Sequence, residues 1–436
     1  MQINYKLTGL AIVMIGGLIT LPAEAAQFSF TKFDGVSNPL ANPTAINNGG
    51  QIAGNYFDYN DGYYHGFVYG GGSFSSINPA GGAGYLGITG INANGQALGS
   101  YWLGQDENPV DYVPVHAFMS DGKSITNLDA PGVFQTAVTF VGSNGQVGGN
   151  YIESRADTVS PGFVNSGGSF TSLTPPGEKP FYYISINDIS ASGQVAGTFA
   201  YENSPSQGFV YSGGAFTTVN VPGASSTEVK GFDANGQVFG SFFDGVSYNR
   251  YGFLSSGNQY TLLTPSGSTG STIEKVNASG QVAGNFFDSN GVQHGYLYSG
   301  GTYTILDMVG ASFFQVVGMN SLGQVIGNYY TDNYYGFVYS GGLYETVNVP
   351  GSDYGTVLSG INDRGQIIGN YYTQNDTWPY SPGFIASPIP EIEEWAMFLM
   401  GLPLVWWKAG RRQPGNLSVH GLLRSRLPLG TAKGFH

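Results

Sequence analysis

The sequence predicts an all-β fold, an eight-bladed β-propeller closed by its N-terminal strand, with a short apolar helix near the C-terminus. A five-residue kernel, Gly-Gln-x-x-Gly, recurs eight times at spacings of 42 to 50 residues, and such a period is typical of repeat architectures. Each repeat has the content of four short strands, as in a propeller blade. The last repeat stops after its third strand, whereas a strand-like segment precedes the first repeat. We expect that segment to complete the last blade, because closure removes exposed sheet edges; an open β-solenoid is the alternative.

Each kernel predicts a hairpin corner. The kernel glutamines are Gln51, Gln96, Gln146, Gln194, Gln237, Gln281, Gln324 and Gln366. Gly precedes every one of them, and the residue four positions earlier is Asn, Asp, Ser or Gly, which is typical of a type I turn followed by a left-handed residue. The following strand is apolar on both faces, so we expect it to be covered on both sides. The second kernel Gly, for example Gly54 or Gly240, lies inside that strand, where crowding near a central axis would require it.

The third and fourth strands of each repeat complete the blade. The third strand is aromatic, as in His65–Tyr69, and a Gly-rich turn leads to a fourth strand such as Phe216–Val221. If the first strand of each repeat is innermost and the fourth outermost, the short turns share one face of the ring. The connections from second to third strand and from fourth to first strand share the other face, which we call the loop face. Those connections vary most in length, and variable loops on a rigid scaffold are where binding usually occurs.

The composition excludes several functional classes. Only 10% of the 436 residues are charged, while Gly, Tyr and Phe number 69, 30 and 28. Between Gln27 and Pro390 there are 24 acidic and 8 basic residues, so the repeats carry about −16, a charge that repels nucleic acid. The absence of Cys excludes disulfides and thiolate metal sites.

The N-terminus predicts export. Residues 1–26 have Lys6, an apolar run and an Ala-Glu-Ala-Ala end, the pattern of a secretory signal peptide. A membrane anchor is the alternative, but the apolar run is shorter than the roughly 20 residues of a span. The repeats then occupy residues 27–387.

The C-terminus predicts a membrane-directed segment at 388–412. Glu391 precedes an apolar stretch that ends at Arg411 and Arg412, the charge order of a segment whose basic end stays in the cytoplasm. As a helix the stretch is about 24 Å long, short for a core of about 30 Å, so we expect transient anchoring in the inner membrane. Residues 413–436 form a basic, Leu-rich tail with no period.

Two resemblances follow from these motifs. The repeats, including the literal His116-Ala117-Phe118, resemble the extracellular HAF-type repeats of bacteria over nearly all of residues 28 to 385, a family that implies no established activity. The segment from Pro390 and Glu391 to the arginine pair is similar to the PEP-CTERM sorting signal, although Ile392 stands where the second Pro of the motif would be. That resemblance implies processing by a membrane exosortase and delivery to the outer surface of a Gram-negative, exopolysaccharide-producing cell.

The candidate ligand site is the longest departure from the repeat. Its aromatic and charged residues lie in two neighbouring loops: Trp102, Asp106, Glu107, Asp111 and Tyr112, with Glu153, Arg155 and Asp157. Aromatic rings stack on sugar faces and carboxylates bind hydroxyls, so the set suits a polysaccharide, although an insertion tolerated on a propeller rim has the same pattern. We expect a binding or structural module with no catalytic residues; the alternative is a polysaccharide-active enzyme, a glycosidase or lyase, on the same face.

The remaining polar motifs favour structural roles. The eight glutamines could ring a ligand, but satisfying backbone groups between blades explains better why every repeat has one. His65, His116 and His294 fall in three different repeats, so we expect no metal site. The Asp-rich turns at 58–62 and 288–291 resemble fragments of calcium loops but lack the closing Glu, which leaves no expected cofactor and calcium as the alternative.

Overall fold

The computed structural model describes residues 28–33, 41–79, 85–102, 114–142, 145–155, 157, 159–177, 181–257, 259–374 and 381–389. The expected signal peptide, the C-terminal helix, the residues of the sorting signal and the basic tail lie outside these ranges. Within them, no helix has the length and apolarity needed to cross a membrane. The strands belong to one compact unit, Phe28–Pro388.

The described fold is all-β, as the sequence predicts. The first strands of the repeats are β2 (Ala41–Ile46), β6 (Tyr85–Ile91), β10 (Gln135–Val141), β14 (Phe181–Ile189), β18 (Ala224–Phe232), β22 (Gly270–Val276), β26 (Phe313–Met319) and β30 (Gly355–Ile361). The second strands are β3 (Ile52–Asp58), β7 (Ala97–Trp102), β11 (Val147–Ile152), β15 (Val195–Tyr201), β19 (Val238–Asp244), β23 (Val282–Phe287), β27 (Val325–Tyr330) and β31 (Ile367–Tyr372). The third strands are β4 (Tyr63–Gly70), β8 (Val115–Ser120), β12 (Gly162–Ser166), β16 (Gln207–Ser212), β20 (Arg250–Ser256), β24 (Gln293–Ser299), β28 (Tyr334–Ser340) and β32 (Gly383–Pro388). The fourth strands are β5 (Ser73–Ile77), β9 (Ile125–Asn127), β13 (Ser169–Leu173), β17 (Ala215–Val219), β21 (Gln259–Leu263), β25 (Thr302–Leu306) and β29 (Leu343–Val347), and β1 is Phe28–Lys32.

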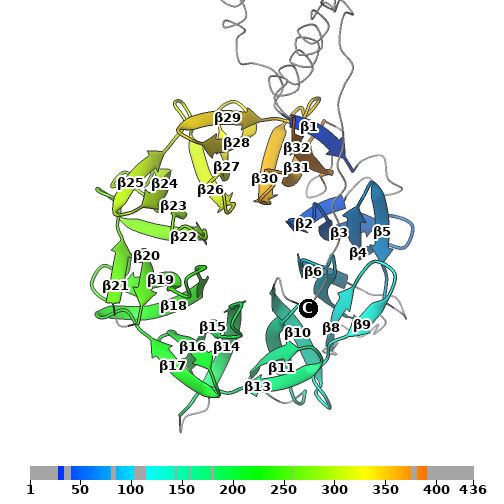
Figure 1. The fold of residues 1–436 in the computed structure, drawn as a ribbon, viewed down its shortest axis with the longest axis vertical. Helices are drawn as coiled ribbons and strands as arrows, with labels where there is room; N and C mark the ends of the chain where they lie inside the picture. The colour runs from blue at the N-terminus through cyan, green and yellow to red at the C-terminus, as the bar shows by residue number, and fades with distance from the viewer. Residues whose placement is uncertain are drawn as a thin grey trace, which may run out of the picture. The chain divides into compact units, whose positions relative to one another are not determined.

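Consecutive strands pair antiparallel into four-stranded sheets, which Figure 1 shows arranged like blades around a central opening. In the described residues, six sheets have four strands, and a seventh has eight because a single parallel bridge between Tyr334 and Gly355 joins two four-stranded groups. The second of those groups contains β30, β31, β32 and β1. In it β1 pairs antiparallel with β32, with Phe28 opposite Pro388.

The kernel corners are confirmed as hairpin turns. In the first repeat the Asn47 N–H donates to the Gln51 carbonyl at 3.0 Å and the Gly50 N–H donates to the Asn47 carbonyl at 3.0 Å. Gly50 has φ 79°, and the glycine before each of the other seven glutamines is also left-handed. Local turn chemistry therefore fixes every corner.

The second kernel glycine is required for a different reason than expected. A Cβ on Gly240 would lie 2.0 Å from the Glu228 carbonyl oxygen of the paired strand β18, and 3.0 Å from the Phe253 ring of β20. The register of β18 against β19 shifts beside this point. Crowding thus arises within the sheet, at a β-bulge, and the expectation of crowding at the central axis was wrong.

The core lies between neighbouring sheets. The apolar clusters join residues of successive repeats, as when Val68 of the first repeat packs with Leu86 and Ile88 of the second. Fully buried aromatic rings of the third strands, such as Phe67, occupy the interior. The sheets therefore stabilise one another face to face, and their edges present side chains to the loop face and to the central opening.

Candidate functional site

The kernel glutamines support an asparagine that reaches the next repeat. Asn47 accepts the Gln51 N–H through Oδ1 at 2.9 Å, and its Nδ2 donates to Gln51 Oε1 at 3.0 Å. The same Nδ2 donates to the Asn92 carbonyl of the next repeat at 2.9 Å. Asn320 and Asn362 make the equivalent bonds to the following repeat. In these three repeats the glutamine supports the turn, but the amide that crosses between repeats belongs to the asparagine.

A second amide, which the sequence pattern did not predict, joins the sheets. Asn328, four residues after the kernel glutamine, donates from Nδ2 to the Leu358 carbonyl at 3.0 Å and accepts the Leu358 N–H at 2.7 Å. Asn285 holds Val316 in the same way. The side chain thus satisfies both backbone groups of one residue in the neighbouring repeat, much as a paired strand would. The recurring Gly-Asn-Tyr after the kernel is the sequence signal that could have revealed it.

The loop face of the first two repeats carries a strip of aromatic rings. We call Tyr59, Phe57, Tyr64, Tyr85 and Trp102 the aromatic strip. Successive ring centroids lie 5.2, 5.2, 5.7 and 4.6 Å apart, and the last pair is stacked with an interplanar angle of 17°. The strip comes from the ends of β3 and β7 and the starts of β4 and β6, and its exposed members are Tyr59, Tyr85 and Trp102 at 60%, 41% and 38%. Such rings offer several adjacent stacking surfaces to a ligand.

The sequence-predicted site residues are only partly brought together. Trp102 joins the aromatic strip through Tyr85, whereas Asp106, Glu107, Asp111 and Tyr112 lie outside the described residues. Glu153, Arg155 and Asp157 are exposed on the loop of the third repeat. There Asp157 accepts the Ser154 N–H at 2.7 Å, which closes a turn within that loop. The strip itself depends on first-repeat residues that the sequence analysis treated as ordinary.

Carboxylates border the aromatic strip at the turn between β3 and β4. Asp58 Oδ1 accepts the Asn60 N–H at 2.8 Å, and Asp61 Oδ1 accepts the Tyr63 N–H at 3.0 Å. The Asp61 Oδ2 lies 2.8 Å from His65 Nε2. This turn therefore places two acidic side chains beside the exposed ring of Tyr59.

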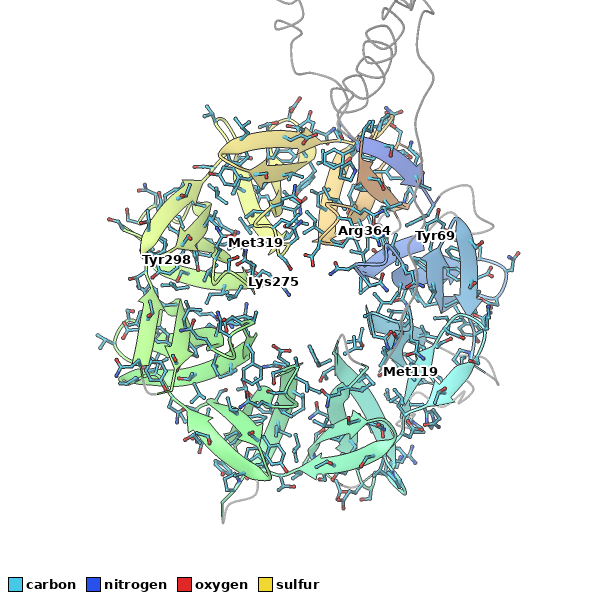
Figure 2. All side chains as sticks on the ribbon, viewed as in Figure 1. Tyr69, Met119, Lys275, Tyr298, Met319 and Arg364 are labelled. Carbon is cyan, nitrogen blue, oxygen red and sulfur yellow. The ribbon has the colours of Figure 1, made fainter. Side chains whose placement is uncertain are left out.

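The central opening holds a concave site on the face of the kernel corners. A cavity of about 490 Å³ is lined by residues of several repeats, among them Asn48, Lys275, Met319 and Asp363. Figure 2 shows Lys275 and Met319 at the edge of the opening. Burial acts to raise the pKa of Asp363, but hydrogen bonds from the Ser321 N–H and the Asn48 amide hold it below its ordinary value.

Charged residues near this opening depart from the repeat. Five repeats have Ala or Gly two positions before the kernel asparagine position, but the fourth and sixth have Asp188 and Lys275. Burial raises the pKa of Asp188, which accepts the Phe232 N–H at 2.8 Å. Burial lowers the pKa of Lys230, whose Nζ donates to the Ile273 carbonyl at 2.7 Å. Asp188 and Lys230 thus each form a hydrogen bond to the next repeat, which assigns them a structural role.

Comparison with known proteins supports the fold. The sequence matches no protein-family model and no curated protein. One similar solved structure comes from a structural and mechanistic study of two prolyl endopeptidases (TM-score 0.51, 12% identity, covering 85% of this chain). Another is dipeptidyl peptidase 4 of Porphyromonas gingivalis (TM-score 0.53, 10% identity, covering 77%). These likenesses show the fold alone.

The chain spans 59% and 57% of the length of those two structures. The β-propeller domain of the Trilobed protease from Pyrococcus furiosus is also similar, with a TM-score of 0.47 and 9% identity over 71% of this chain and 95% of that one. The β-propeller fold is thus supported by the four-stranded sheets around a central opening and by the first two structures.

Proposed function

We propose that this protein is an exported, eight-bladed β-propeller, closed by its N-terminal strand, that binds extracellular polysaccharide as a surface or matrix module. The observation that carries the binding role is the aromatic strip on the loop face. Five rings from two adjacent repeats form a continuous series, three of them exposed, and carboxylates lie beside it. Ring faces stack on pyranose rings and carboxylates accept hydrogen bonds from hydroxyls.

Contacts between the first and last repeats support ring closure. The Asn362 Nδ2 donates to the Asn47 carbonyl at 3.0 Å, the same bond that joins sequential repeats. Ile368 and Ile385 of the last repeat pack in one buried cluster with Ile52 of the first. Together with the pairing of β1 and β32, these contacts support the proposed ring closure.

An engineered disulfide tests the closure. Ser29 and Ser387 are opposite each other in the β1–β32 ladder, where antiparallel Cα atoms lie about 4.5 to 5.5 Å apart, within the range of a disulfide. Because the chain has no Cys, the pair Ser29→Cys and Ser387→Cys should form one intramolecular disulfide, whereas Ser29→Cys with Ser256→Cys in the fifth repeat should not. If the Ser29→Cys/Ser387→Cys protein formed no disulfide under oxidising conditions, the proposed ring closure would be refuted.

Glycan binding tests the proposed role. The purified protein should bind a subset of bacterial polysaccharides on a glycan array. Tyr85→Ala and Trp102→Ala should each weaken binding about twofold to thirteenfold, since a ring contact is worth about 0.5 to 1.5 kcal/mol. The matched control is Phe287→Ala, which removes the ring at the position of Trp102 in the sixth repeat. If the Tyr85→Ala/Trp102→Ala double variant bound polysaccharide as tightly as wild type, the aromatic strip would be eliminated as the binding site.

The signal-like N-terminus and the PEP-CTERM-like C-terminus support export and sorting. We propose that an exosortase-like enzyme recognises Pro390 and Glu391 while the apolar segment is in the inner membrane. The released protein then reaches the outer surface of a Gram-negative cell. Expression with and without an exosortase tests this, and equal surface display of wild type and Glu391→Ala would contradict it.

A further inference from the structure

We propose that Asp58, Asp61 and His65 form a site for a divalent metal ion on the loop face of the first repeat. Within the described residues this is the one group of three or more His, Cys, Asp or Glu whose ligand atoms converge, with one atom from each residue within 4.8 Å of the others. Metal–ligand distances for carboxylate oxygen and imidazole nitrogen are about 2.0 to 2.6 Å. Three donors at this separation can therefore share one ion.

The turn between β3 and β4 orients the two carboxylates. Backbone N–H groups of Asn60 and Tyr63 hold one oxygen of each aspartate, and Gly62, with φ 78°, closes the turn. Asp61 is accessible, with 44% of its side chain exposed. An ion from solvent can reach the carboxylates without rearrangement of the sheet.

The third donor, His65, comes from strand β4 and is held in place by packing. His65 is only 8% exposed and stacks on Tyr56 with centroids 5.3 Å apart, so packing fixes its ring with Nε2 toward Asp61. Its Nδ1 is buried and has no hydrogen-bond partner. Because Nδ1 lies on the side of the ring away from Asp61, Nε2 is the nitrogen that would bind the ion.

Two other repeats provide an internal comparison. His116 and His294 occupy the same strand position, and their Nδ1 atoms lie 2.8 Å from Asp129 and Asp307 after the fourth strand. In the first repeat Asn78 stands at that position. In the sixth repeat the carboxylates of Asp288 and Asp307 lie near opposite nitrogens of the ring, so they cannot converge on one ion. The first repeat thus lacks the aspartate that holds Nδ1 in the other two and has a second aspartate on the Nε2 side.

The donor set indicates the class of metal. Two carboxylate oxygens and one imidazole nitrogen suit Mn²⁺ or Zn²⁺, whereas Ca²⁺ takes six to eight oxygen ligands. An ion at Nε2 replaces the hydrogen bond between His65 and Asp61, so its affinity falls at low pH, where protons compete for these groups. The inference concerns metal binding itself and does not depend on the glycan proposal.

Calorimetric titration of chelator-treated protein with MnCl₂, ZnCl₂ and CaCl₂ tests the site. We expect one Mn²⁺ or Zn²⁺ per chain, bound more tightly than Ca²⁺, and a wild-type melting temperature that rises with the metal. Asp58→Asn and Asp61→Asn should each weaken binding by at least about tenfold, whereas the control Asp288→Asn in the sixth repeat should leave it unchanged.

A spectroscopic measurement of the histidine ligand separates loss of metal binding from loss of folding. With Mn²⁺ bound, pulsed electron paramagnetic resonance should detect an imidazole nitrogen that His65→Gln removes, with far-ultraviolet circular dichroism as the control for folding. Absence of saturable binding by Mn²⁺ and Zn²⁺, or equal affinity in the Asp58→Asn/Asp61→Asn double variant, would overturn the proposal. So would a Mn²⁺ complex without nitrogen coupling.

Discussion

Replacing Asn328 by Ala should destabilise the protein more than most single substitutions do. Asn328 is 4% exposed and pairs with both backbone groups of Leu358 in the next repeat. Ala would leave that N–H and that carbonyl buried without partners, each at about 1 to 3 kcal/mol. We therefore expect a loss of about 2 to 6 kcal/mol in the free energy of unfolding.

The second repeat suggests the matched variant. There Ser100 occupies the same position and accepts the Val138 N–H at 3.0 Å through its hydroxyl. Asn328→Ser should keep the bond to the Leu358 N–H and lose the bond to the carbonyl, at about half the cost of Ala. Asn290→Ala, which removes an exposed amide in a turn, should cost less than about 1 kcal/mol.

Thermal unfolding and hydrogen exchange measure these effects. With an unfolding entropy of about 2.1 cal/mol/K per residue, the unit Phe28–Pro388 should lose about 1.3 °C in melting temperature per kcal/mol. The Ala variant should therefore melt about 3 to 8 °C lower, with faster amide exchange at Leu358. A stability within 0.5 kcal/mol of wild type, or a Ser variant as unstable as Ala, would refute the pairing as the source of the energy.

Two further predictions concern backbone crowding and a half-buried carboxylate. Gly240→Ala places a Cβ 2.0 Å from a carbonyl oxygen and should lower the free energy of unfolding in denaturant by roughly 3 kcal/mol or more. Gly318→Ala, whose Cβ would lie 3.7 Å from its nearest neighbour, should be nearly neutral. Equal losses of stability in the two variants would contradict the crowding. Burial raises the pKa of Glu345 from 4.5 to about 7, so ionisation is penalised in the folded state. The penalty is absent below about pH 4.5 and grows as the pH rises through about 7. Glu345→Gln should therefore raise the melting temperature relative to wild type at pH 8 but not at pH 4.5, and a pH-independent difference would contradict the assignment.

The parts of the fold that depend on local chemistry could be predicted from the sequence. The corner at Asn47 to Gln51 needs a turn former, a left-handed residue and a hydrogen-bonded pair, and all three are within five residues of one another. The four-strand content of each repeat follows from alternation and turn residues in the same way. The reason for Gly240 could not be predicted, because it depends on the register of β18 against β19 and the ring of Phe253.

Most contacts between repeats could not be predicted from the sequence. Asn328 looks like an ordinary strand residue until the neighbouring sheet is placed beside it, because its partner lies 30 residues later in the chain. The aromatic strip has the same origin: Tyr64 and Tyr85 belong to different repeats and meet only when the two sheets stack. Spacing within one repeat carries no information on such pairs.

Comparing equivalent positions in different repeats identifies some functional residues that the spacing of motifs along the chain does not reveal. His65 and His294 look alike in sequence, and their positions in distant repeats argue against a shared metal. The relevant partners are instead the residues of each histidine's own turn: Asp61 is an addition in the first repeat, and Asn78 replaces the carboxylate that Asp307 supplies in the sixth. A residue that every repeat needs is explained by stacking of the sheets. Among the three repeats with a histidine at this strand position, only the first combines Asp61 with Asn78, which is why the metal proposal concerns the first repeat and excludes the sixth.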